Sequence, residues 1–220
     1  MTESEWWGLV PEEWRERPEF AWVADDPALP RVLLLGDSIS MSYTAPVRRL
    51  LAGEACVHRP PANCRSTRHS LAELDGWLGD GRWRVIHCNW GIHDITQVQA
   101  AGIQQVGIQE YEHNLETLFD RLAATGAALI WATTTPVQEG TPSRSPADVV
   151  RYNQAAARIV AARGIVVDDL YALALPRMTE LQPPRNVHFT ETGAGVLAAQ
   201  VADSIRDALQ AAHVNTGETK

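Results

Sequence analysis

The sequence predicts an α/β protein in which a parallel sheet of about five strands lies between two layers of helices, a three-layer, flavodoxin-like arrangement. The first observation behind this prediction is the aliphatic run 32–35, bounded by Pro30 and Gly36, which is typical of a strand buried on both faces. The second is that short apolar runs alternate with segments of helical periodicity along the chain. This alternation favours parallel strands joined by right-handed crossovers.

The first part of the chain supplies three of the expected strands. The strand before Gly36 leads into a helix after Ser38, because apolar residues recur there at helical spacing. A weak strand over 55–58, a polar loop over 59–68 and a helix over 70–78 follow. The strong apolar run 84–90 ends at Gly91 and predicts the third strand.

The second part continues the alternation. Apolar residues at helical spacing predict a helix over 108–122, which Gly126 ends, and the run 127–133 predicts a strand. Ser145-Pro146 is a helix start with an N-cap serine, and Gly164 ends that helix. A short strand over 165–167 and an amphipathic helix over 191–211, capped by Thr190, complete the order.

The domain organisation follows from this pattern. The chain is long enough for one domain with a large core, which we place at 31–212. Residues 1–30 hold four of the eight tryptophans without clean periodicity, and we expect an extension that packs on the body through its rings. The alternative is that this extension borders a substrate cleft. Residues 213–220 are expected to form a flexible tail.

Composition argues against several classes of function. A net charge of −8 without a basic stripe argues against a nucleic-acid partner. The chain has no run of about eighteen apolar residues and no basic, apolar leader, so we expect a cytoplasmic protein without a membrane partner. The three cysteines form no CxxC and the histidines show no paired spacing, so no metal is predicted. Gly36 stands alone where a nucleotide-binding loop needs several glycines, so no cofactor is predicted. Nothing in the sequence sets the oligomeric state.

Polar residues gather where the predicted strands end, at the sheet edge where open α/β sheets bind ligands. The residues on this edge come from four segments of the chain: Ser38, then Asn63, Arg65 and Ser66, then His93 and Asp94, and finally His188. A serine, a histidine and loop donors are what acyl transfer needs as nucleophile, base and oxyanion donors. The alternative is that Asp37-Ser38 only caps the next helix.

On these residues the sequence resembles the SGNH (GDSL-type) hydrolase family over most of 31–211. The first block is Gly36-Asp37-Ser38-Ile39, the third is Gly91-Ile92-His93-Asp94 where the family has Gly-x-Asn-Asp, and the last is Arg185-Asn186-Val187-His188 where it has Asp-x-x-His. The resemblance implies that Ser38 is the nucleophile, with its own N–H in the oxyanion hole, and that His188 is the general base. The second-block donor would lie near Arg65 or Ser66.

One departure from the family is His93, which stands where an Asn side chain donates to the oxyanion. A neutral imidazole carries one N–H and can take that role. The alternative is a histidine that hydrogen-bonds Asp94 and only shapes the loop. Asn89, on the same strand, is a rival donor, unless it is a buried amide satisfied by its neighbours.

The second departure is Arg185, which replaces the Asp that accepts the Nδ1–H of the catalytic histidine. Arginine cannot accept a hydrogen bond. Either His188 relies on a backbone carbonyl, or Asp94, Asp168 or Asp169 substitutes, or the site is weakened. Asp168-Asp169 is better explained as the cap of the following helix. We expect the Arg185 side chain to point away from His188, toward solvent or an anionic part of the substrate.

The sequence therefore predicts an SGNH-like esterase that acts on a small-molecule ester, O-acetyl esters included, through an acyl-enzyme on Ser38 with His188 as general base. One alternative is an acyltransferase that uses the same intermediate. The other is a binding member of the fold with weakened catalysis. The tryptophans favour an aromatic-lined or sugar-stacking cleft.

Overall fold

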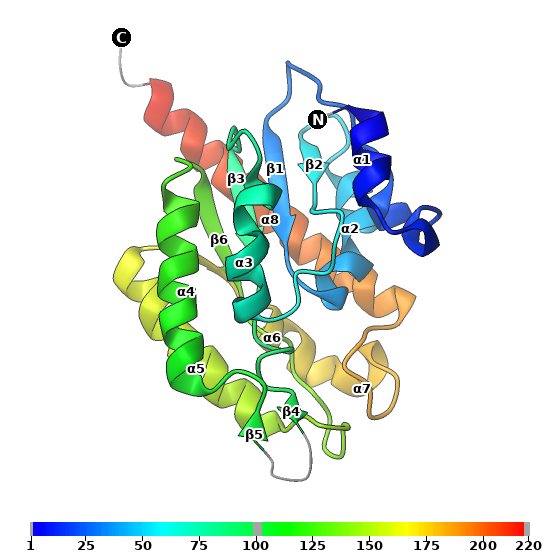
Figure 1. Cartoon of the computed structure of the whole chain (residues 1–220), viewed down its shortest axis with the longest axis vertical. Helices are drawn as coiled ribbons and strands as arrows, with labels where there is room; N and C mark the ends of the chain where they lie inside the picture. The colour runs from blue at the N-terminus through cyan, green and yellow to red at the C-terminus, as the bar shows by residue number, and fades with distance from the viewer. Residues whose placement is uncertain (1, 99–102, 218–220) are drawn as a thin grey trace.

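The computed structural model describes residues 2–98 and 103–217, and its centre is a five-stranded parallel sheet (Figure 1). The strands lie in the order β2-β1-β3-β6-β7. Their bounds are Arg31–Leu35 for β1, Cys56–His58 for β2, Val85–Cys88 for β3, Ala128–Ala132 for β6 and Val166–Asp168 for β7. Counted along the chain this order is 2-1-3-4-5, the flavodoxin-like order, so the predicted fold class is confirmed.

Helices cover both faces of the sheet. On one face α2 packs against α8, and on the other α3, α4 and α5 pack side by side (Figure 1). These helices span Ser38–Leu50 (α2), Thr67–Leu78 (α3), Ile108–Ala123 (α4), Pro146–Arg163 (α5) and Glu191–Gly217 (α8). The short helices α6 (Leu170–Ala174) and α7 (Met178–Leu181) lead from β7 to the loop before α8.

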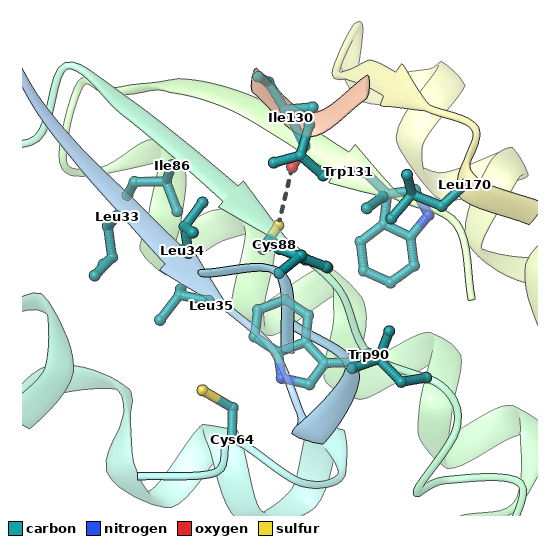
Figure 2. Packing of buried hydrophobic residues seen from close by; sticks show 14 of the residues in the cluster. Leu33, Leu34, Leu35, Cys64, Ile86, Cys88, Trp90, Ile130, Trp131 and Leu170 are labelled. Atoms are coloured by element: carbon teal, nitrogen blue, oxygen red, sulfur yellow. Dashed lines mark hydrogen bonds between the residues drawn. The ribbon is translucent and has the colours of Figure 1, made fainter. Parts of the chain in front are cut away.

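The core lies where the central strands are buried on both faces. Leu33, Leu34 and Leu35 of β1 are at most 1% exposed, as expected for a strand covered by helices on either side. Figure 2 shows them with Cys88 of β3, the register partner of Leu35, whose thiol donates to the Ile130 carbonyl of β6 at 3.5 Å. This packing holds the carboxyl ends of β1 and β3 in fixed relation, and the polar residues of the site follow both.

Most helix boundaries follow the predicted caps. Ser145 accepts the Ala147 N–H, Pro146 begins α5, and Gly164 ends it in the left-handed conformation at φ 63°. Thr190 accepts the Gly193 N–H at 3.0 Å at the start of α8, as predicted. Helix α8 continues to Gly217, beyond the end that was expected at residue 211. No Gly or Pro interrupts the chain between Ala211 and that residue.

Two local features differ from the predictions. Helix α3 begins at Thr67, three residues before the expected start, because Ser66 supplies an N-cap within the expected loop. The loop after β3 contains a small antiparallel pair, β4 (Gln97–Val98) and β5 (Ile103–Gln104). Residues 99–102, which connect these strands, lie outside the described part.

The amino-terminal extension packs on α2 beside the edge strand β2. It contains α1 (Glu3–Leu9) and two 3₁₀ turns, Glu12–Trp14 and Pro18–Phe20. Trp6, Val10 and Phe20 form a cluster with Met41 of α2. The Trp6 indole donates to the Phe20 carbonyl at 2.8 Å, so its buried N–H is satisfied. Within the described residues, no helix is long and apolar enough to cross a membrane.

Candidate active site

Ser38 is the first residue of α2, and only Gly36 and Asp37 separate it from β1. Asp37 caps the helix by accepting the Ile39 N–H at 2.8 Å, which leaves the Ser38 N–H among the helix's unpaired amino-terminal donors. Gly36 makes the turn possible, since a Cβ there would lie 2.8 Å from the Ser40 Cβ. Ser38 thus stands on a tight strand-to-helix turn at the carboxyl edge of the sheet. The capping alternative accounts for Asp37 but leaves the Ser38 hydroxyl free for other partners.

The loop before α8 brings His188 to that hydroxyl. The Ser38 Oγ and His188 Nε2 are 2.9 Å apart, although the residues are 150 positions apart in the chain. The His188 Nδ1 lies 2.9 Å from Oδ1 of Asn186. The same oxygen accepts the backbone N–H of His188 at 3.0 Å. The predicted pair is therefore together in the structure, with an unexpected third residue behind it.

The hydrogen bonds assign the proton on the His188 ring. A backbone N–H can only donate, so the Asn186 atom that it meets is the amide oxygen, and Nδ1 must then donate to the same oxygen. Nε2 is left with its lone pair facing the Ser38 hydroxyl. This tautomer is the one that a general base needs.

Asn186 was missed because the prediction looked for an acceptor at the family position, three residues before the histidine. The oxygen comes instead from two residues before, through a turn in which an Asn side chain accepts the N–H of residue i+2. The sequence signal was Asn186-Val187-His188, since Asn readily forms such turns. The sequence prediction considered a backbone carbonyl or another Asp as the acceptor for His188, and it did not consider this residue.

Arg185 points away from His188, as expected. Its Nε donates to the Gly140 carbonyl at 2.8 Å, and its backbone N–H donates to Oε1 of Gln138 at 3.2 Å. Its backbone has φ of 55°, the left-handed region that non-glycine residues rarely adopt. Arg185 therefore ties this loop to the segment that holds Gln138 and Gly140.

The acids considered as substitutes for the family Asp have other partners. Asp168 meets Nε2 of the buried His87 at 2.9 Å and accepts from the Gln200 amide at 2.7 Å. Asp169 caps α6 by accepting the Ala172 N–H, as predicted for one of this pair. Asp94 accepts both the backbone N–H and the hydroxyl of Thr67, at 3.0 and 2.6 Å. In the described structure the ring of His188 is oriented by an amide and not by a carboxylate.

Asp94 also corrects the alternative proposed for His93. The Asp94 carboxylate binds the start of α3 and not His93, so it ties the loop after β3 to the loop that precedes α3. Burial raises the Asp94 pKa to about 7, against the lowering effect of the Thr67 hydrogen bonds. The Asp94 side chain is thus a structural tie between the second and third blocks.

The second block, the loop that holds Asn63, Arg65 and Ser66, lies against the turn that carries Ser38. The Cys64 N–H donates to the Gly36 carbonyl at 3.3 Å. Asn63 Oδ1 accepts the Arg65 N–H at 2.9 Å, and this turn gives Arg65 a positive φ of 52°. Because the Arg65 N–H is already paired, the Ser66 N–H is the better second-block donor of the two.

His93 is half-buried and uncharged at neutral pH. Burial lowers its pKa to about 4, and the positive charges of Arg144 and Arg65 add to that effect. It therefore carries a single N–H. Asn89, the rival donor, uses its side-chain Nδ2 to donate a hydrogen bond to the Ala132 carbonyl at 2.8 Å. This bond joins the end of β3 to the end of β6.

Arg144 is a residue of the site that the sequence did not single out. Its Nε donates to the Ile92 carbonyl at 3.0 Å, so it supports the loop that carries His93. It comes from the long loop between β6 and α5, and no motif marks it.

Asp37 is a fully buried acid next to Ser38. Burial raises its pKa to about 6, while the hydrogen bond from Ile39 and the charges of His188 and Arg144 act in the opposite direction. Its Oδ2 has no hydrogen-bond partner within the described residues. The Asp37 carboxylate is thus close enough to His188 for their charges to interact, although no hydrogen bond joins them.

Comparison with solved structures places this site on a known fold. A lipase/acylhydrolase from Enterococcus faecalis superposes with a TM-score of 0.70 at 20% identity, covering 81% of this chain and 96% of that one. The acetyl xylan esterase AlAXEase gives a TM-score of 0.68 at 15% identity, covering 80% and 99%. The acetylxylan esterase Axe2 from Geobacillus stearothermophilus gives 0.66 at 18%, covering 80% and 94%. At these identities the likeness establishes the fold, which is the SGNH-type fold that the sequence blocks resemble.

Two structures of Axe2 are described as catalytic mutants, in which a serine or a histidine is replaced by alanine. Neither a scan against protein-family models nor a search of curated proteins found a match. In residues 2–98 and 103–217, no group of three or more His, Cys, Asp or Glu side chains is arranged to hold a metal ion.

Proposed function

We propose that this protein is a serine ester hydrolase of the SGNH type, which removes a small acyl group such as acetyl from an alcohol. The observation that carries the proposal is the continuous arrangement of Ser38, His188 and Asn186, with 2.9 Å at each of the two links. The esterase and acylhydrolase neighbours support the same class of reaction.

In the first step the Ser38 oxygen attacks the ester carbonyl carbon while its proton moves to Nε2 of His188. The C–O bond to the alcohol then breaks, and His188 returns the proton to the leaving oxygen, which leaves an acyl group on Ser38. A water molecule repeats the sequence on the acyl-enzyme, so the products are a carboxylic acid and an alcohol. Asn186 holds the ring in the required tautomer throughout.

Charge develops at two places during this reaction. The negatively charged oxygen of the tetrahedral intermediate accepts hydrogen bonds from the Ser38 N–H at the amino terminus of α2, from the Ser66 N–H and from the neutral His93. The imidazolium form of His188 receives no charge from Asn186, because the amide is neutral. The buried Asp37 carboxylate, which interacts with the His188 charge, takes over part of that stabilisation.

Hydrolysis is favoured over acyl transfer because the base is open to solvent. His188 is exposed and Ser38 is half-buried, so water can reach the acyl-enzyme. The pairing of Ser38 with a correctly oriented base also favours catalysis over a purely binding role.

The test is hydrolysis of p-nitrophenyl acetate by the wild type, Ser38→Ala and Ser42→Ala. Ser42 lies one turn further along α2, where its hydroxyl donates to the Ile39 carbonyl, so it is a matched control. We expect Ser38→Ala to lose at least about 10³-fold in kcat with little change in Tm, and Ser42→Ala to keep its activity. Substantial activity in Ser38→Ala would remove this residue from the reaction and with it the proposed function.

A further inference from the structure

A cavity of about 480 Å³ lies apart from the Ser38 site, between the amino-terminal extension and α3. Four tryptophans line it, two from the extension and two from α3 and the turn after it: Trp6, Trp22, Trp77 and Trp83. Trp22 and Trp77 are only half-buried, so parts of their rings remain open. We call this space the tryptophan cavity.

The tryptophan cavity lies where the extension, with its short helix α1, faces α3 over the edge of the sheet. Its floor contains Leu33 of β1 and its register partner His58 of β2, which is the edge strand. One wall is the irregular extension, and the other is the face of α3 that carries Glu73, Gly76 and Trp77. A Cβ added at Gly76 would meet no heavy atom within 4 Å, so the space beside Trp77 is open.

Four ionisable groups around the cavity, Asp25, Arg31, His58 and Asp80, are paired with one another. Asp25 lies 2.8 Å from Nε2 of His58 and 3.1 Å from Nε of Arg31. Arg31 also pairs with Asp80 at 2.7 Å and stacks over the Trp83 ring at 4.1 Å. A charged ligand would therefore meet no uncompensated partner in this set. A neutral ligand with many hydroxyls would find donors and acceptors beside flat aromatic faces.

A stripe of side chains runs along one side of α3, from the loop that holds Arg65 to the cavity. Arg65, His69, Glu73 and Trp77 follow at intervals of four residues, so they lie on one side of the helix and of the turn before it. The rings of His69 and Trp77 are 5.9 Å apart. From residue 69 to residue 77 the helix rises about 12 Å. A ligand must therefore be extended to reach along the stripe.

We propose that the tryptophan cavity binds a neutral oligosaccharide, whose sugar rings stack on Trp77 and Trp22 and whose hydroxyls meet the Asp25, Arg31 and His58 network. The further statement that the same chain reaches along the α3 stripe, so that one of its ester groups meets Ser38, rests on the proposed function. Binding to the cavity does not rest on it. A long acyl chain fits this arrangement poorly, because the stripe between the two sites is charged and polar.

The test is calorimetric titration of the full-length protein with short unsubstituted oligosaccharides of xylose, glucose, mannose, galactose and N-acetylglucosamine. These compounds contain no O-linked ester, so binding is measured without turnover. We expect at least one to bind with a Kd below about 1 mM. The informative variant is Gly76→Leu, which adds bulk to the open space beside Trp77 without removing any contact.

Gly8→Leu is the matched control, since Gly8 also lies on an exposed helix face with no heavy atom near its Cβ position and does not line the cavity. We expect Gly76→Leu to weaken binding at least tenfold and Gly8→Leu to leave it unchanged. Trp77→Ala should also weaken it tenfold or more, whereas Trp14→Ala, outside the cavity, should not.

Three results would overturn the proposal: no binding by any of the oligosaccharides, equal binding by wild type and Gly76→Leu, or binding of decanoate that Gly76→Leu abolishes in place of oligosaccharide binding. Failure of the proposed function has a different signature. If no ester is hydrolysed while Gly76→Leu still abolishes oligosaccharide binding, the catalytic assignment fails and the cavity stands.

Discussion

Replacing Asn186 perturbs a feature of the site that the family resemblance did not imply. The side-chain oxygen of Asn186 holds both the backbone and Nδ1 of His188, so Asn186→Ala removes two hydrogen bonds at once. The ring can then rotate and can protonate on either nitrogen. In a serine protease, a base held in the wrong tautomer costs about 10⁴ in kcat. A ring that samples both tautomers should lose less, and we expect a loss of about 10² in kcat, which is about 2.7 kcal/mol of activation free energy.

Asn186→Asp should act in the opposite direction. A carboxylate keeps both acceptor bonds and adds a negative charge beside the imidazolium that forms in the transition state. Because Asn186 is exposed, the interaction is close to the value in water, about 1 kcal/mol at about 4 Å. This corresponds to an increase in kcat of about fivefold. The acid limb of the kcat/KM profile should also move to higher pH, since a negative charge favours the protonated ring.

The control for both variants is Arg185→Asp. A carboxylate at this position restores the family residue, but the Arg185 side chain is directed to the Gly140 carbonyl and not to His188. The rate should therefore stay within about twofold of the wild type. The assay is steady-state hydrolysis of p-nitrophenyl acetate, with Tm recorded for each variant. Wild-type kcat in Asn186→Ala, or a large gain in Arg185→Asp, would refute the role given to Asn186.

Two further predictions concern the neighbouring groups. If the His93 N–H donates to the oxyanion, His93→Ala should lower kcat by about 10²–10³ and His93→Asn by less, and equal losses would favour a role in shaping the loop. Asp37→Asn should raise the free energy of unfolding at pH 8 by up to about 3 kcal/mol, because the Asp37 pKa rises from 3.8 to about 6 on folding and a buried charge is removed. The folded wild type binds the Asp37 proton more tightly than the unfolded chain does, so its free energy of unfolding falls as pH rises from about 4 to about 6. The gain in Asp37→Asn should therefore vanish near pH 4. Chemical denaturation at the two pH values measures this, and an equal gain at both would contradict it. The same variant should lower kcat, because the charge that interacts with His188 is lost.

The regular part of the fold was predictable from local signals. The buried run 32–35, the Ser145-Pro146 start and the Gly164 stop each carry their meaning within a few residues. The convergence of Ser38 and His188 also followed, because parallel strands bring their carboxyl ends to one edge. The sheet order was implied by the flavodoxin-like class and not by any single residue.

The remaining features depend on contacts that sequence patterns do not encode. Asn186 meets His188 within a loop in which the preceding residue, Arg185, adopts a positive φ. The pairing of His87 with Asp168 joins β3 and β7, which are not neighbours in the sheet, so no spacing of residues in the sequence predicts it. The tryptophan cavity comes from an aperiodic extension folding over an edge strand, and aromatic residues without periodicity do not reveal which face they cover.

The central claim is that Ser38 is an activated nucleophile, and reaction with a fluorophosphonate followed by intact-mass measurement tests it most directly. The probe reacts only with a serine whose hydroxyl a neighbouring base activates. Wild-type protein should gain the mass of one phosphonyl group, and peptide mapping should place it on Ser38. Ser38→Ala should gain none, and His188→Ala should label far more slowly. An unlabelled wild type, or a Ser38→Ala variant that labels as the wild type does, would contradict the account.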